Sequence, residues 1–203
     1  MPESERKRQA GKAGARRKPP RKATPGYLER AALFYLDRYA TSADNLRQVL
    51  RRKVARSAWA HGGDPAAGEA AVEALIARFL EAGLLDDARY AEGRARSLAR
   101  RGQSLRGIRL RLRQKGVGED EIAAALAGLR DEAGDPELAA ALAYARRRRL
   151  GPFRAGAARA AQRERDLAAL ARRGFDPDLV LKVIDAESPD ALEDEIAAPG
   201  LSP

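Results

Sequence analysis

The chain repeats part of its own sequence at a fixed spacing, and this repetition limits the folds that it can adopt. The residues at positions 42, 46, 50 and 53 reappear 62 positions later as Ser104, Ile108, Leu112 and Lys115. A second alignment sets residues 112–126 beside residues 170–184, so that Gly116 falls on Gly174. The middle of the chain therefore resembles both of its neighbours, which predicts three consecutive repeats that stack on one another.

The apolar residues follow a helical period, and no stretch alternates with the period of two that a strand needs. One expected helix places Val72, Leu75, Ile76, Phe79 and Leu80 inward, and Trp59 is expected to pack in the core. Aromatic residues make up only 5% of the 203 residues, so thin helical layers are favoured over one thick core. We predict an all-α fold of three tandem three-helix repeats in an elongated array, with disordered or loosely ordered tails.

The repeats and the changes in composition predict five segments. Residues 1–26 form a basic tail that contains Pro and Gly, and residues 188–203 form an acidic tail. Three-helix repeats are expected at residues 27–85, 86–134 and 135–187. Like charges combined with Pro and Gly leave the first tail little to bury.

Two adjacent carboxylates, Asp86 and Asp87, precede a run of arginines. Neighbouring helical residues point about 100° apart, so the two carboxylates do not converge on one atom. An aspartate at a helix N-cap accepts hydrogen bonds from free main-chain amides, which favours a capping interpretation over acid chemistry. Gly83, just before them, is expected to end the preceding helix in a left-handed conformation.

Residues that carry catalysis are sparse in this sequence. There is no cysteine, the single histidine, His61, lies in a Gly-Gly-Asp-Pro turn, and no phosphate-binding glycine motif occurs. No apolar run approaches the roughly 18 residues of a membrane helix. We therefore expect a cytoplasmic protein that is not an enzyme and has no cofactor, no metal site and no membrane partner.

The net charge of +10 is unevenly distributed. Residues 1–25 hold 9 Lys and Arg against 2 acids, and the rest of the chain holds 30 against 27. Beyond the tail, blocks alternate: 10 basic and 3 acidic residues in 86–115, then 1 and 7 in 116–143. The blocks in 144–175 and 176–203 hold 10 against 2 and 1 against 8. Base composition of the genome could raise arginine by itself, and a charge run is often only a solvated face.

Closely spaced arginines repel one another on a helix unless an anion is near, and guanidinium groups form two parallel bonds to phosphate oxygens. We therefore expect basic helical faces to bind DNA phosphates. The candidate residues are Arg94, Arg100, Arg101, Arg106, Arg109, Arg111, Arg113, Lys115, Arg146, Arg147, Arg148, Arg149 and Arg154. The tail offers further nonspecific DNA contacts at Arg16, Arg17, Lys18, Arg21 and Lys22.

Three short motifs resemble those of one protein family. They are "GLLDDARYA" at residues 83–91, the pattern Ser-x3-Ile-x3-Leu-x2-Lys-Gly at residues 104–116, and "LARRGF" at residues 170–175. In this order and spacing they resemble RecX, the bacterial regulators of the RecA recombinase. The likeness covers residues 27–185 and leaves out both tails. The first repeat departs from the pattern, because Val54 follows Lys53 where the family has Lys-Gly.

The resemblance implies a curved, three-repeat helical monomer that lies along the groove of RecA–DNA filaments. It implies a regulator of recombination and DNA repair that limits strand exchange and the coprotease activity. Arg106, Arg109, Arg113 and Lys115 would then face either DNA phosphate or the recombinase.

Two other functions remain open from the residues alone. A sequence-specific regulator of helix-turn-helix type would use Arg106 and Arg109 on a recognition helix. A metal-dependent nuclease would use Asp86, Asp87 and a later carboxylate.

Overall fold

The structure is a computed structural model that describes residues 19–197. This part of the chain contains ten α-helices, one short 3₁₀-helix and no strand, which confirms the all-α prediction. The helices are α1 (Pro25–Leu36), α2 (Ala43–His61), α3 (Pro65–Glu81), α4 (Asp87–Arg100), α5 (Leu105–Arg113), α6 (Glu119–Ala133), α7 (Pro136–Arg148), η1 (Gly151–Phe153), α8 (Ala158–Ala171), α9 (Pro177–Asp185) and α10 (Pro189–Ala197).

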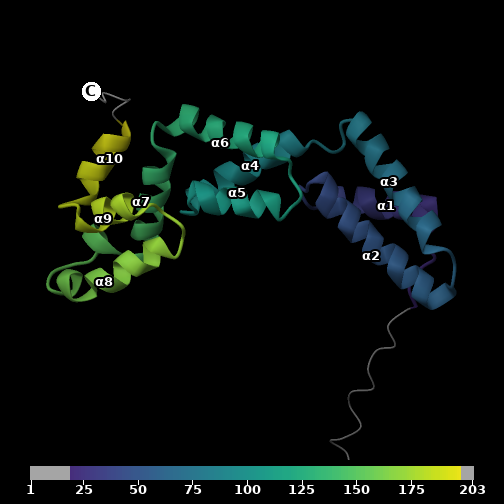
Figure 1. The fold of residues 1–203 in the computed structure, drawn as a ribbon, viewed down its shortest axis with the longest axis horizontal. Helices are drawn as coiled ribbons and strands as arrows, with labels where there is room; N and C mark the ends of the chain where they lie inside the picture. The colour runs from purple at the N-terminus through teal and green to yellow at the C-terminus, as the bar shows by residue number, and fades with distance from the viewer. Residues whose placement is uncertain (1–18, 198–203) are drawn as a thin grey trace, which may run out of the picture.

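The helices form three groups that follow one another along the long axis of the molecule (Figure 1). Helices α1–α3 make up unit 1, α4–α6 unit 2, and α7–α10 with η1 unit 3. Each unit has its own cluster of buried side chains. Both outer units extend to the same side of unit 2, so the array is bowed (Figure 1).

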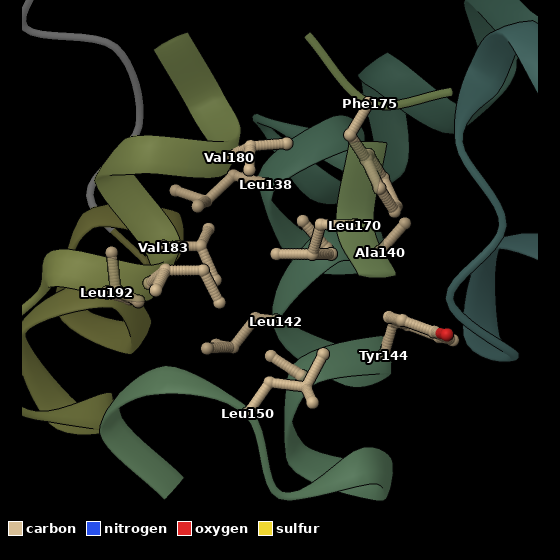
Figure 2. Close-up of a cluster of buried hydrophobic side chains, with 13 residues drawn as sticks. Leu138, Ala140, Leu142, Tyr144, Leu150, Leu170, Phe175, Val180, Val183 and Leu192 are labelled. Atoms are coloured by element: carbon tan, nitrogen blue, oxygen red, sulfur yellow. The ribbon is translucent and has the colours of Figure 1, made fainter. Parts of the chain in front are cut away.

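The cores are small and consist mainly of aliphatic side chains. In unit 3, Leu138 and Leu142 of α7 meet Leu170 of α8 and Val183 of α9 (Figure 2). Burial of one such side chain contributes about 1.5–3 kcal/mol. Because each cluster is thin, every unit gains stability from contact with its neighbour.

The helix ends follow from local sequence. Asp86 is the N-cap of α4, and its carboxylate accepts a 2.8 Å hydrogen bond from the amide of Arg89. Asp135 caps α7 in the same way, with Pro136 in the first turn. Gly83 follows α3 with a φ of +67°, the left-handed conformation expected there. The capping interpretation of Asp86 is therefore confirmed.

Helix α2 is longer than its counterpart α5, and the sequence difference after Lys53 explains this. Gly116 breaks the chain after α5 with a φ of +70°, whereas Val54 at the matching position continues α2 and is buried. The helix then runs to His61.

The prediction that Trp59 packs in the core is wrong, because its side chain is 87% exposed. In a helix of 3.6 residues per turn, Trp59 lies on the side opposite to Leu46, Leu50 and Val54, which face the core. Leu80, also expected inward, is 44% exposed at the end of α3.

The joint between units 2 and 3 is polar and highly specific. Ser104, fully buried at the N-cap of α5, donates a 2.6 Å hydrogen bond to the carbonyl of Arg173 after α8. The amide of Leu105 donates to the carboxylate of Glu137 on α7 at 2.7 Å. Two free amides at the start of α5 are thus satisfied, one by Ser104 itself and one by the neighbouring unit.

The joint between units 1 and 2 has the same construction. Ser42 at the N-cap of α2 donates to the carbonyl of Lys115 after α5. The amide of Ala43 donates to Asp87 of α4 at 2.7 Å. The serine that recurs at a spacing of 62 residues therefore forms the same kind of joint at both unit boundaries.

Two segments differ from the tails that the sequence predicted. Within residues 19–24, the amide of Ala23 donates to Ser57 at 2.9 Å and His61 donates to the carbonyl of Pro20 at 2.6 Å. These contacts fix the segment beside α2. The predicted acidic tail contains helix α10, whose Leu192 is buried in unit 3, because its apolar positions fall on one helical face despite its charge.

Candidate nucleic-acid and filament-binding surface

Helix α5 carries four of the predicted basic residues and Lys115 follows its end, and all five are exposed. Arg109 and Arg113 lie beside α6, where both contact Glu119, at 3.5 and 2.7 Å. Their charge is partly balanced within the protein. An exposed pair of this kind contributes at most about 1 kcal/mol, so a phosphate could replace the carboxylate.

Arg106 and Arg111 have no ion-pair partner anywhere in residues 19–197. Between them lies Leu110, which is 54% exposed. On α5, these are the two arginines whose charge is not balanced by a carboxylate of the described residues.

Lys115 joins this surface to unit 1. Its ammonium group donates to the side chain of Asn45 on α2 at 3.0 Å, while its carbonyl accepts from Ser42. Lys115 thus belongs to the joint and also presents a charge beside it.

Helix α2 carries two arginines that match Arg109 and Arg113 of α5, and they were not among the residues predicted from the sequence. Arg47 and Arg51 both contact Glu73 of α3, at 2.9 and 3.0 Å. They lie 62 positions before Arg109 and Arg113, so the repeat spacing itself could have revealed them. Two arginines sharing one glutamate are therefore a feature of both units.

Helix α4 places its predicted residues elsewhere. Arg94 is partly buried, Arg101 follows the last turn, and Arg100 lies at a groove between α4 and α7. This groove has a volume of about 550 Å³. Besides Arg100 it is lined by four alanines and by Arg96, Leu129, Glu132 and Pro136. Arg100 therefore lies near the last turns of α6, whereas Arg109 and Arg113 contact Glu119 at its start.

The end of α7 gathers four arginines in different settings. Arg146 pairs with Glu193 of α10 and lies 5.5 Å from the ring centre of Phe153. Arg147 lies 5.7 Å from the ring centre of Tyr144. Arg148 and Arg149 are exposed, and Arg149 has a φ of +55°, which directs the chain away from the helix.

Arg154 has a partner inside unit 3. Its guanidinium group makes two hydrogen bonds, of 3.1 and 2.8 Å, to the carboxylate of Asp166, which is only 2% exposed. Burial alone would raise the pKa of Asp166, but the hydrogen bonds from Arg154 and from the amide of Gly151 outweigh it. The pKa of Asp166 therefore lies below its ordinary 3.8, and the geometry gives Arg154 a structural role.

The structure describes two of the five basic residues predicted to contact DNA before α1. Arg21 and Lys22 are exposed next to α2. Arg16, Arg17 and Lys18 lie outside the described residues.

The adjacent carboxylates that could have served a nuclease have structural partners. Asp86 caps α4, and Asp87 accepts from the amide of Ala43. Burial raises the pKa of Asp87 above its ordinary 3.8, although that hydrogen bond opposes the rise and nearby Glu121 adds to it. Within residues 19–197, no three His, Asp or Glu side chains lie close enough together to hold a metal ion.

No helix in the described part of the chain combines the length and the apolar character that crossing a bilayer requires.

Comparison with known proteins agrees with the three-helix units. Residues 86–126 match the family model described as the second three-helix domain of RecX. No solved structure matches the chain.

The chain is 44% identical to the regulatory protein RecX of Myxococcus xanthus over 169 residues, which cover 83% of this chain and 90% of that protein. It is 34% identical to the regulatory protein RecX of Stenotrophomonas maltophilia over 134 residues, 66% of this chain and 76% of the relative. A third regulatory protein RecX, from Thermobifida fusca, is 46% identical over 59 residues, 29% of this chain and 32% of its own length. An identity of this size over most of both chains shows that the protein belongs to the RecX family.

Proposed function

We propose that this protein binds the nucleoprotein filament of the RecA recombinase as a monomer and limits its activity in recombination and DNA repair. The regulatory names of its relatives support a regulatory function without catalysis. The observation that carries the proposal is the pair Arg106 and Arg111, two exposed arginines without an ion-pair partner in the described residues.

The bowed array supports binding at several points along a polymer. Basic groups occur on α5 in unit 2 and at the end of α7 in unit 3, and the joints hold these units in fixed relation. Phosphate contacts at successive units add, because binding of one unit raises the effective concentration of the next. Acidic residues of α6 without an arginine partner in the described residues, such as Asp120 and Asp131, would face the protein part of the filament.

The direct test is titration of the protein into RecA filaments on single-stranded DNA, with ATP hydrolysis, strand exchange and coprotease cleavage as readouts. We expect all three to fall as the protein approaches stoichiometric amounts. Unchanged rates at stoichiometric amounts would overturn the proposal.

A double variant tests the surface itself. Arg106→Ala with Arg111→Ala should weaken the inhibition and lower the slope of log affinity against log salt by about 0.7–0.9 for each phosphate that is no longer neutralised. The matched control is Arg30→Ala with Arg165→Ala, which removes the same charge from exposed positions on α1 and α8. Equal loss of inhibition in both double variants would mean that only net charge matters.

The sequence-specific regulator remains the second candidate, but the position of α5 disfavours it. A recognition helix presents its N-terminal residues to the base edges. Here the start of α5 contributes to the joint, where Ser104 contacts Arg173 and Leu105 contacts Glu137, and of residues 105–108 Arg106 alone is exposed. Competition between one specific duplex and random duplexes would separate the two functions, since the proposed regulator should show no preference.

A further inference from the structure

Trp59 is exposed on a helix whose apolar face is already buried. Its side chain is 87% accessible, and it is the single tryptophan of the chain. Exposed single apolar residues are common on proteins, so the argument depends on what surrounds this one.

The side chains around Trp59 are cationic. Arg56 precedes it by three residues and Arg52 by seven, which places both on the same face of α2, within about 10 Å along the helix axis. Both arginines are exposed, and neither has an ion pair with any residue from 19 to 197. No Asp or Glu occurs between Asp44 and Asp64. We call Arg52, Arg56 and Trp59 the α2 strip.

An exposed indole beside unpaired guanidinium groups suits one class of ligand best. Single-stranded nucleic acids present unstacked bases next to phosphates, and proteins bind them by stacking bases on aromatic rings and by pairing phosphates with cations. A duplex hides its base faces inside the stack. The strip therefore matches a single strand better than a double helix.

An anionic membrane would also attract arginines and tryptophan, but the remaining residues of α2 argue against it. A membrane-surface helix needs a broad apolar face to insert. The apolar face of α2, with Leu46, Leu50 and Val54, is packed in unit 1, and the strip offers a single apolar side chain.

We propose that the α2 strip of unit 1 is a binding site for single-stranded nucleic acid, in which Trp59 stacks on a base while Arg52 and Arg56 contact the flanking phosphates. This site lies in a different unit from the arginines of α5. The inference goes beyond the proposed function, because it concerns bare nucleic acid and needs no recombinase.

The single tryptophan makes the test direct, since the intrinsic fluorescence of the full chain under selective indole excitation reports Trp59 alone. We would titrate the protein with an oligomer of thymidine about 20 nucleotides long, above the footprint of one strand-binding domain, and with an abasic oligomer that carries the same phosphates. The thymidine oligomer should quench the fluorescence and the abasic oligomer should not.

Variants separate stacking from charge. Trp59→Ala should weaken binding of the thymidine oligomer, measured by anisotropy of a labelled strand, by roughly 5- to 150-fold, without changing the salt slope. Trp59→Phe should recover part of the affinity. Arg52→Ala with Arg56→Ala should lower the salt slope by about 0.7 for each phosphate that is no longer neutralised. The matched control is Phe34→Ala on α1. Phe34 is also exposed, and its ring centre lies 3.9 Å from the guanidinium carbon of Arg38. This variant should bind the thymidine oligomer like the wild type.

Three results would overturn the proposal. They are equal quenching by the abasic oligomer, quenching by vesicles of anionic lipid but not by oligomers, and unchanged affinity in Trp59→Ala. Because RecA is absent from these measurements, their failure would leave the filament proposal standing, and failure of the filament assay would leave this site standing.

Discussion

The hydroxyl of Ser104 and the carbonyl of Arg173 lie 2.6 Å apart, although 69 residues separate them in the chain. Ser104 also accepts from the amide of Gly107 at 3.1 Å. One buried side chain therefore caps a helix and fastens unit 2 to unit 3. This double use explains why the same serine recurs at position 42.

Replacement of Ser104 by alanine should destabilise the protein by about 1–3 kcal/mol, because the helix loses its cap and a partly buried carbonyl loses its donor. Urea unfolding followed by circular dichroism measures this. Thr24→Ala is the comparison: Thr24 caps α1 from an exposed position, and we expect a loss of about 1 kcal/mol or less. Equal losses would show that the bond to Arg173 contributes nothing.

Two glycine-to-alanine substitutions should change the stability of the protein in opposite directions. Gly116 has a φ of +70°, and an added Cβ would lie 2.3 Å from the Cβ of Asp44 across the joint. Gly116→Ala should therefore cost about 1–3 kcal/mol, from backbone strain and displacement of α2. At Gly128, within α6, an added Cβ would have no tertiary neighbour within 4 Å, so Gly128→Ala should increase stability by up to about 1 kcal/mol. Thermal unfolding of both variants checks the pair, and a stable Gly116→Ala variant would contradict the joint geometry.

Two carboxylates should titrate on opposite sides of the ordinary aspartate value. Burial raises the pKa of Asp87 above 3.8, and Arg154 holds the pKa of Asp166 below 3.8. The stability that Asp87 contributes is present below pH 3.8 and is lost as the pH rises through the raised pKa of Asp87. The stability that Asp166 contributes is present above pH 3.8 and is lost as the pH falls through the lowered pKa of Asp166. Carboxyl NMR titration measures both values directly.

The variant Asp87→Asn isolates the first effect. Its amide oxygen can still accept from Ala43, but it does not titrate, so wild-type stability should fall relative to the variant as pH rises from 3.8 through the raised pKa. A difference that stays constant from about pH 3.5 to about pH 7 would contradict this expectation.

Arg154→Ala should act on stability more than on binding. It leaves the carboxylate of Asp166 buried without its partner, and such losses cost about 3–5 kcal/mol when both groups are buried. Arg154 is 27% exposed at its side chain, so we expect the lower end of that range or less. The double change Arg154→Leu with Asp166→Leu should recover stability. Oligonucleotide affinity of the folded Arg154→Ala protein should match that of the wild type.

The all-α class and the positions of several helix ends could be predicted because they depend on neighbours a few residues apart. Asp86 caps α4 and Gly83 ends α3 for local reasons, an amide that needs an acceptor and a backbone that needs a positive φ. The spacing of 62 residues likewise revealed the repeat. The prediction for Trp59 was wrong because it did not take α2 as one continuous helix to His61; in that helix, the period places Trp59 opposite to the core residues.

The use of each charge, by contrast, was decided by tertiary packing. In the sequence, Arg106, Arg109 and Arg154 are equivalent cations. In the folded protein, Arg106 has no ion pair among the described residues, whereas Arg109 pairs with Glu119. Arg154 pairs with the buried Asp166. Asp87 of unit 2 accepts a hydrogen bond from the amide of Ala43 at the start of α2, in unit 1. Local patterns specify backbone geometry because hydrogen bonds in helices span four residues, whereas ion pairs and joints depend on which distant segments meet, and only the packed units bring those segments together.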